Sequence, residues 1–183
     1  PEEAKIIALD ILKKVAMPSP EQRINQYPHE LSGGMKQRVM IAMSIVCGPS
    51  LLIADEPTTA LDVTIQAQIL DLLDELRKET QMSILLITHN LGIVAQYADR
   101  VAVMYSGKIV EHSSVEKIFT VPSHPYTKGL LNSLPQDIIN EKLETIQGSV
   151  PHPAFLPRGC AFHPRCQDKM DVCTREIPKL EDL

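Results

Sequence analysis

Two short apolar runs with an amphipathic segment between them constrain the fold of this 183-residue chain more than any other feature. Residues 51–54 (LLIA) and 83–88 (SILLIT) are short and rich in Leu and Ile, which is typical of strands buried on both faces. Between them, residues 63–78 place their apolar side chains on one side of a helix. A strand, a helix and a second strand predict parallel strands joined by a crossover, and therefore an α/β fold.

Three other segments have helical apolar spacing: residues 2–16, 34–46 and 91–97. Ser32 stands just ahead of the second of these helices and is expected to cap it, because its hydroxyl can accept a bond from a first-turn amide. Cys47 lies in an apolar run and is expected to be a small core residue.

The remaining sequence predicts a hairpin and then a change in character. Residues 100–105 form a third apolar strand, and the turn at Ser106 and Gly107 lets residues 108–111 pair back on it. Beyond about residue 120 the sequence is interrupted by frequent prolines. This last part is therefore expected to be an extension of short helices and extended loops.

Composition excludes several classes of protein. Apolar residues make up 44% and charged residues 22%, as in soluble globular proteins, so there is enough apolar material for a core. The net charge of −5 opposes a general nucleic-acid-binding surface. The apolar region at residues 39–54 is broken by Gly48 and Pro49 and is shorter than the ~20 residues of a membrane-spanning helix. The first residues lack the pattern of a secretory leader.

The most informative motif is a serine followed by two glycines at the start of a predicted helix (Ser32, Gly33 and Gly34). Such a turn lets the backbone approach a phosphate, and the first-turn amides and the helix dipole favour an anion there. The alternative interpretation is an ordinary helix N-terminus with a flexible start.

Acidic and polar residues follow both predicted strands. Asp55 and Glu56 come directly after the first, at the edge where open α/β sheets bind ligands. Asp55 suits the water shell of a phosphate-bound Mg²⁺, and Glu56 suits orienting or deprotonating an attacking water. His89 follows the second strand and can contact a γ-phosphate, and Asp62 is a plausible cap for the helix at 63–78. Each also has a structural interpretation, as a solvated acid, a structural histidine or a simple cap.

The order and spacing of these motifs resemble the second half of an ABC-type ATPase domain, over residues 2–111. The resemblance implies an incomplete P-loop NTPase core with parallel strands and flanking helices, and ATP with Mg²⁺ as cofactors. The resemblance also implies a role for each motif residue by its position. ATP held by the second subunit of a head-to-tail dimer would contact Ser32, Gly33, Gly34 and Gln37. Asp55 would be linked to Mg²⁺, Glu56 would be the catalytic carboxylate, Asp62 would communicate across the dimer, and His89 would be a switch that contacts the γ-phosphate.

The C-terminal part of the sequence, beyond about residue 120, narrows the resemblance to one group of ABC-type ATPases. Residues 123–131 (SHPYTKGLL) and 159–166 (GCAFHPRC), followed by Cys173, resemble the C-terminal extension of dipeptide and oligopeptide importer ATPases. That family implies an ATP-hydrolysing subunit that powers peptide import through a membrane permease, at the cytoplasmic face of the cell membrane. Its partners would be the permease and a second ATPase subunit, identical or paralogous. Nickel importer ATPases share the core and part of the tail and remain an alternative.

A phosphate-binding P-loop is absent from the sequence. Such a loop needs Gly-x-x-x-x-Gly-Lys-Ser/Thr, but the only Gly-Lys pair, Gly107 and Lys108, is followed by Ile109. We therefore expect the C-terminal part of a longer protein, inactive alone. Its expected parts are residues 1–50 of the helical subdomain, residues 51–119 of the ATPase core, and the extension at 120–183.

Three cysteines cluster near the end of the chain, at Cys160, Cys166 and Cys173. Cytosolic thiols at this spacing suggest metal ligation more than disulfides. The resemblance implies an iron–sulfur cluster with an outside ligand, and zinc with His163 is a second possibility. Free or partly oxidised thiols are the third.

Two other functions compete with transport. A non-transport ABC-type ATPase of DNA repair or chromosome organisation uses a similar signature, but no long heptad coiled coil interrupts this sequence and its acidic balance opposes DNA binding. The other alternative is a non-catalytic binding or regulatory piece.

Overall fold

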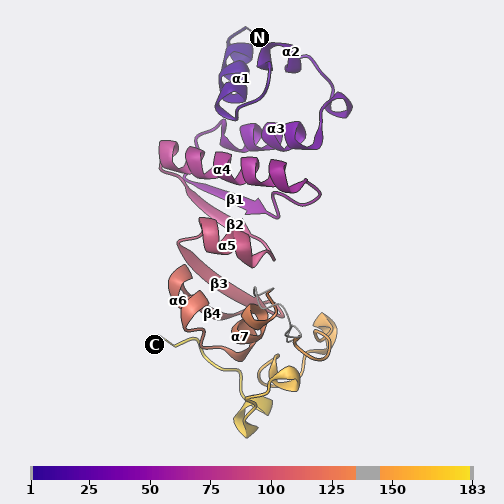
Figure 1. Ribbon diagram of the computed structural model, residues 1–183, viewed down its shortest axis with the longest axis vertical. Coiled ribbons are helices and arrows are strands. Elements are labelled where there is room, and N and C mark those ends of the chain that lie inside the picture. The colour runs from indigo at the N-terminus through magenta and orange to yellow at the C-terminus, as the bar shows by residue number, and fades with distance from the viewer. Residues whose placement is uncertain (1, 135–144, 182–183) are drawn as a thin grey trace, which may run out of the picture. The chain divides into compact units, whose positions relative to one another are not determined.

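The computed structural model describes residues 2–134 and 145–181, so residues 135–144 of the predicted extension lie outside the description. The chain divides into two compact units, Pro1–Asn90 and Leu91–Leu183. Each unit is described by itself below (Figure 1). The three-part domain division expected from the sequence stays a prediction.

The first unit packs its helices on one side of two strands. Its elements, in order, are α1 (Glu2–Lys14), α2 (Pro20–Arg23), the single 3₁₀ turn η1 (Pro28–Glu30), α3 (Gly33–Ile45), β1 (Leu51–Asp55), α4 (Val63–Thr80) and β2 (Ser83–Ile87). Strands β1 and β2 are parallel and in register from the pair Leu51 and Ser83 to the pair Asp55 and Ile87. Helix α4 connects them, which confirms the predicted parallel crossover.

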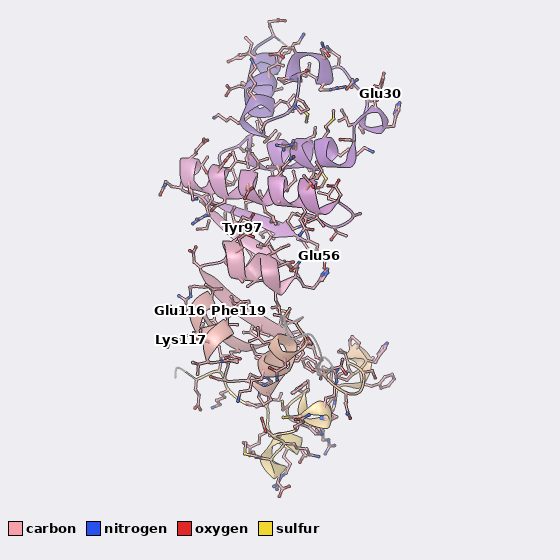
Figure 2. The ribbon with its side chains drawn as sticks, in the orientation of Figure 1. Glu30, Glu56, Tyr97, Glu116, Lys117 and Phe119 are labelled. Atoms are coloured by element: carbon pink, nitrogen blue, oxygen red, sulfur yellow. The ribbon has the colours of Figure 1, made fainter. Side chains whose placement is uncertain are left out.

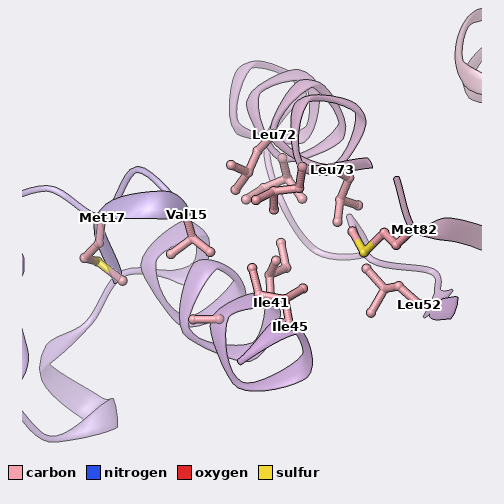
Figure 3. Close-up of a cluster of buried hydrophobic side chains, with 11 residues drawn as sticks. Val15, Met17, Ile41, Ile45, Leu52, Leu72, Leu73 and Met82 are labelled. Atoms are coloured by element: carbon pink, nitrogen blue, oxygen red, sulfur yellow. The ribbon is translucent and has the colours of Figure 1, made fainter. Parts of the chain in front are cut away.

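The core of this unit lies between α3, α4 and one side of the strands. Leu72 and Leu73 of α4 face Ile41 and Ile45 of α3 (Figure 3). The other members come from α3 and α4 themselves, from the residues just after α1, from β1 and from the residue before β2; they are Val15, Met17, Ala42, Leu52, Ile69, Leu76 and Met82. The predicted amphipathic helix is therefore confirmed, and its apolar side builds the core.

The two strands are not buried on both faces, so that part of the prediction is wrong. Leu52 and Ala54 of β1 are buried, but Leu51 and Ile53, which point to the opposite face, are exposed. Strand β2 shows the same alternation, with Leu85 and Ile87 among its exposed residues. The reason is that the buried side is the one that faces the core, while the other side of the pair is open within the described residues.

Cys47 is also a correction, because it is exposed rather than a core residue. The core side of α3 carries Ile41 and Ile45, and Cys47 lies beyond the end of that helix. Gly48, with a φ of 60°, then reverses the chain towards β1. The apolar run at this point ends in a turn and does not continue the buried stripe.

The second unit begins with α5 (Leu91–Tyr97) and a hairpin of β3 (Arg100–Tyr105) and β4 (Lys108–Ser114). The strands are antiparallel, and the turn residues Ser106 and Gly107 both have positive φ, as the tightest hairpin turns require. The predicted hairpin is confirmed. Within the described residues β3 and β4 form a two-stranded sheet.

Short helices and loops make up the rest of this unit, as predicted. They are α6 (Val115–Thr120), α7 (Pro125–Asn132) and the 3₁₀ turns η2 (Pro153–Phe155), η3 (His163–Arg165) and η4 (Asp171–Thr174). Tyr105 of β3 packs on Tyr126 of α7 and Phe162 ahead of η3, with ring centroids 4.7 and 5.2 Å away. These aromatic contacts tie the tail to the hairpin.

None of the helices in the described ranges, 2–134 and 145–181, has the length and apolarity that crossing a bilayer requires.

Candidate functional site

The serine–glycine turn, Ser32 with Gly33 and Gly34, opens helix α3. Ser32 has the extended backbone of an N-cap, and its Oγ accepts a bond from the amide of Met35 at 3.3 Å, which confirms the predicted cap. A hydroxyl that accepts from the helix still has its own proton to donate. The turn therefore offers a hydroxyl donor and the amides of the first helical turn to an anion.

Glu56 lies immediately beyond β1 and is held there by its backbone (Figure 2). Its amide donates to the carbonyl of Ile87 at 2.9 Å, so the residue is tied to the end of β2. Its φ of 43° is in the left-handed region, which a residue with a Cβ seldom adopts. Strained residues of this kind cluster at functional sites.

The Glu56 carboxylate has two side-chain partners. His89 Nδ1 lies 2.8 Å from Oε1, and the Thr59 hydroxyl donates to Oε2 at 2.9 Å. The bond from His89, and then the bond from Thr59, lower the pKa of Glu56 below its ordinary value. Glu56 is therefore ionised at neutral pH and oriented from two sides, as a base for water requires.

The state of His89 follows from this pairing. An ionised carboxylate only accepts, so Nδ1 of His89 carries the proton in this bond. Nε2 of a neutral ring is then an acceptor, and donation from Nε2 to a phosphate requires the protonated ring. Both side chains are accessible, with exposures of 81% for His89 and 44% for Glu56.

Asp55 and Asp62 occupy different positions. Asp55 is the last residue of β1 and alternates with Ala54, so it belongs to the open face of the strand pair. Asp62 caps α4, with its Oδ1 accepting from the amide of Ile65 at 2.9 Å, which confirms the cap interpretation. Gln37 lies on α3 and is half-buried.

The structure thus brings Glu56 and His89 into contact, and it places Asp55, the residue before Glu56, at the same strand edge. Sequence reasoning missed Thr59 as a partner of the carboxylate. The available signal was its position three residues after Glu56, which is within reach across one tight turn.

The cysteines do not form a ready metal site. Cys160 and Cys173 are joined through the backbone, from the amide of Cys160 to the carbonyl of Cys173 at 2.9 Å. Burial raises the pKa of the Cys166 thiol, and a backbone hydrogen bond at Asp168 opposes that shift. No group of three or more His, Cys, Asp or Glu residues in the described part of the chain is placed to hold a metal ion. The three thiols, as they lie here, therefore do not fit an iron–sulfur cluster or zinc.

Both the N-terminal and the C-terminal part of the chain match known protein families. Residues 2–59 match the ABC transporter family, and residues 110–173 match the C-terminal region of the oligopeptide/dipeptide transporter family. The chain belongs to the ATP-binding subunits of oligopeptide/dipeptide ABC transporters.

Individual relatives agree with this family. The oligopeptide transport ATP-binding protein AppD of Bacillus subtilis is 54% identical over 98% of this chain and 55% of its own length. The dipeptide transport ATP-binding protein DppD of Haemophilus influenzae is 54% identical over 96% of this chain and 53% of its own length. The chain thus spans about half the length of the curated relatives it matches.

Solved structures support the fold. A dimeric structure of the ATP-binding cassette MJ0796, in a post-hydrolysis state with ADP and Pi, has a TM-score of 0.54 and 30% identity to this chain. The match covers 62% of this chain and 48% of that one. The α/β fold with parallel strands, predicted as part of an ABC ATPase core, is therefore confirmed.

Proposed function

We propose that this chain is the C-terminal part of an ATPase subunit that powers peptide import through a membrane permease. The observation that carries the proposal is the oriented, ionised Glu56, hydrogen-bonded to His89 at the carboxyl edge of parallel strands. The names of relatives such as AppD and DppD support peptides as cargo over nickel. They also support transport over DNA repair.

In this proposal Glu56 is the base that orients and deprotonates the attacking water. Its two hydrogen bonds leave the carboxylate ionised and fix its direction. Asp55 would hold the water shell of Mg²⁺ on the open side of β1, where the ion neutralises charge on the transferring phosphoryl group. His89 would sense the γ-phosphate, exchanging its bond to Glu56 for one to the phosphate.

In this proposal the serine–glycine turn contacts a different ATP molecule from the one that Glu56 helps to hydrolyse. We assign Ser32, Gly33, Gly34 and Gln37 to ATP held by a second ATPase subunit in a head-to-tail dimer, and Asp62 to the contact between the subunits. Two observations support this assignment: the exposed hydroxyl and amides of the turn, and the dimeric state named for the MJ0796 cassette.

The phosphate cradle must come from outside this sequence. The chain holds no Gly-x-x-x-x-Gly-Lys-Ser/Thr motif, and its relatives are about twice as long. We therefore propose that the chain alone does not hydrolyse ATP and that the full-length protein does, at the cytoplasmic face of the cell membrane beside its permease.

One further assignment rests on the resemblance. An iron–sulfur cluster at Cys160, Cys166 and Cys173 would require these thiols to rearrange and gain an outside ligand. Visible absorbance and iron content of the full-length protein, prepared without oxygen, test it. A colourless, iron-free preparation rejects the cluster, and colour lost in Cys166→Ala supports it.

The test of the main proposal is Mg-ATP hydrolysis by the full-length protein. Glu56→Gln keeps the shape of the side chain but removes the base, so kcat is expected to fall by about 10²–10⁴-fold. Glu79→Gln, an exposed glutamate near the end of α4, is the matched control and is expected to leave kcat unchanged. Equal rates for Glu56→Gln and the wild type would reject the assignment of the base.

A further inference from the structure

The two glycines of the serine–glycine turn are in close contact with the segment that carries Asp62. A Cβ atom placed on Gly34 lies 2.7 Å from Cγ2 of Ile65. A Cβ atom placed on Gly33 lies 3.3 Å from Cδ2 of Leu61. Favourable contacts between carbon atoms need about 3.5–4.0 Å, so a side chain at position 34 has no room and one at position 33 has little.

Backbone conformation does not explain these glycines. Gly33 and Gly34 are the first two residues of helix α3, and neither has a positive φ. Any residue adopts a helical backbone, so the left-handed region that favours glycine elsewhere is not involved here. What requires a glycine at position 34 in this structure is the side chain of Ile65.

Ile65 joins the two functional segments. Its amide donates to the Asp62 carboxylate at 2.9 Å, and its Cγ2 methyl group is the atom nearest to a side chain at position 34. It is half-buried and packs against the core of the first unit. One helical turn further along α4, Ile69 is fully buried in that core, so the start of this helix has little freedom to move aside.

The loop before Ile65 also touches the proposed base. Thr59 donates to the Glu56 carboxylate, and two residues later Leu61 lies against Gly33. Residues 59–62, called here the 59–62 loop, therefore contact Glu56 at one end and the serine–glycine turn at the other.

We propose that Ile65 is a positioning residue for ATP hydrolysis, which sets the distance between the serine–glycine turn and the 59–62 loop. The proposal rests on the proposed function of the turn as an ATP contact. It assigns the need for glycine at position 34 to the Ile65 methyl group rather than to the approach of a phosphate. A displacement of the Asp62 cap then moves the turn through Ile65.

A second-site rescue in the full-length protein tests this role. Gly34→Ala introduces the clash and is expected to lower kcat by about tenfold or more, as contacting residues that couple by 1.36 kcal/mol do. Ile65→Ala removes the Cγ2 atom and with it the clash, and the new methyl group at position 34 takes its place between the turn and α4. The double variant Gly34→Ala/Ile65→Ala is therefore expected to regain most of that loss. Ile65→Val keeps Cγ2 and loses only Cδ1, so Gly34→Ala/Ile65→Val is the matched control and is expected to stay impaired.

Two further readouts separate positioning from a general loss of structure. The ATP pocket of the same subunit is not formed by the turn, so KM is expected to stay within about twofold while kcat falls. Gly33→Ala, with its longer distance to Leu61, is expected to cost less than Gly34→Ala. If phosphate approach were the reason for both glycines, both alanines would be inactive and Ile65→Ala would rescue neither.

Failure of this inference is distinguishable from failure of the proposed function. A wild type without ATPase activity rejects the proposed function, and the contact is then tested by the thermal midpoint, which should fall in Gly34→Ala and recover in the double variant. An active wild type whose Gly34→Ala/Ile65→Ala variant has the kcat of Gly34→Ala overturns the role of Ile65. Recovery of the midpoint without recovery of kcat overturns it equally.

Discussion

At the scale of single residues, Glu56 combines an unfavourable backbone with a well-supported side chain. Its left-handed φ of 43° costs of order 1–3 kcal/mol, and the bond from its amide to Ile87 keeps it in place. The strained backbone occurs at a position where hydrogen bonds from His89 and Thr59 fix the direction of the carboxylate. This combination is what distinguishes Glu56 from an ordinary solvated acid.

The pH dependence of hydrolysis tests the role of Thr59. The bond from His89, and then the bond from Thr59, lower the pKa of Glu56, so removing the hydroxyl in Thr59→Ala raises that pKa towards its ordinary value. The acidic limb of the pH profile of kcat/KM should therefore move to higher pH. Thr59→Ser keeps a donor and should retain the wild-type profile. An unmoved limb in Thr59→Ala would show that this bond does not tune the base.

The lowered pKa of Glu56 also affects how the stability of the fold depends on pH. A carboxylate whose pKa is lowered by folding contributes stability that is present above the unfolded pKa and is lost as pH falls through the folded pKa. Because Glu56 is accessible to solvent, its contribution to folding stability is small. The lowered pKa therefore matters for catalysis more than for stability.

The sequence predicted the local hydrogen bonds of the candidate site residues better than it predicted their tertiary contacts. Ser32 and Asp62 are readable as caps because capping needs a short polar side chain three residues before an amide, a purely local relation. The contact of Gly34 with Ile65 was not readable, because it joins two helices through tertiary packing. Cys47 was misassigned because hydrophobic neighbours in the sequence do not reveal where a helix ends.

At the scale of helices and strands, α4 connects the site to the core. Ile69 has 0% exposure, whereas Val63 at the start of the same helix has 84%. Ile69→Ala should destabilise the protein by about 2–5 kcal/mol because it leaves a cavity. Val63→Ala should change stability by less than about 0.5 kcal/mol. Urea unfolding measures both, and similar midpoints for the two variants would contradict this arrangement of the core.

The cap of α4 gives a second test at this scale. Asp62→Ala removes the acceptor of the Ile65 amide and should cost about 1 kcal/mol. Asp62→Asn keeps an oxygen acceptor and should lose less. Circular dichroism during urea unfolding gives the difference. A larger loss in the asparagine variant would mean that charge and not the cap bond is what matters at Asp62.

Helix α7 carries a pH-sensitive cap. Nδ1 of His124 accepts from the amide of Tyr126 at 3.0 Å, which requires the neutral ring, and burial lowers the pKa of His124. Its carboxylate neighbour Glu111 opposes that shift and itself accepts from the amides of Ser123 and His124.

A lowered histidine pKa gives stability that is present above the unfolded pKa and declines as pH falls towards the folded value. The thermal midpoint of the second unit should therefore drop as pH is lowered below about 6.5. His124→Asn keeps a capping acceptor without titrating, and should flatten this part of the curve. The same slope in both proteins would assign the pH dependence to other groups.

At the scale of the whole molecule, the elements were predictable and their environment was not. Parallel β1 and β2, helix α4 and the hairpin of β3 and β4 follow from local periodicity and turn chemistry. Burial of the strands on both faces did not follow, because it depends on what covers the side that carries Ile53 and Leu85. The chain spans about half the length of its relatives, and burial is a property of the complete fold.

We propose that Glu56 and the serine–glycine turn belong to an ATPase whose phosphate cradle lies outside this sequence. The most direct measurement is Mg-ATP hydrolysis by this chain alone, by the chain expressed together with the N-terminal half of its full-length protein, and by the same pair carrying Glu56→Gln. We expect no hydrolysis by the chain alone, hydrolysis by the pair, and a rate about 10²–10⁴-fold lower with Glu56→Gln. Hydrolysis by the chain alone, or a pair whose rate is indifferent to Glu56→Gln, would contradict it.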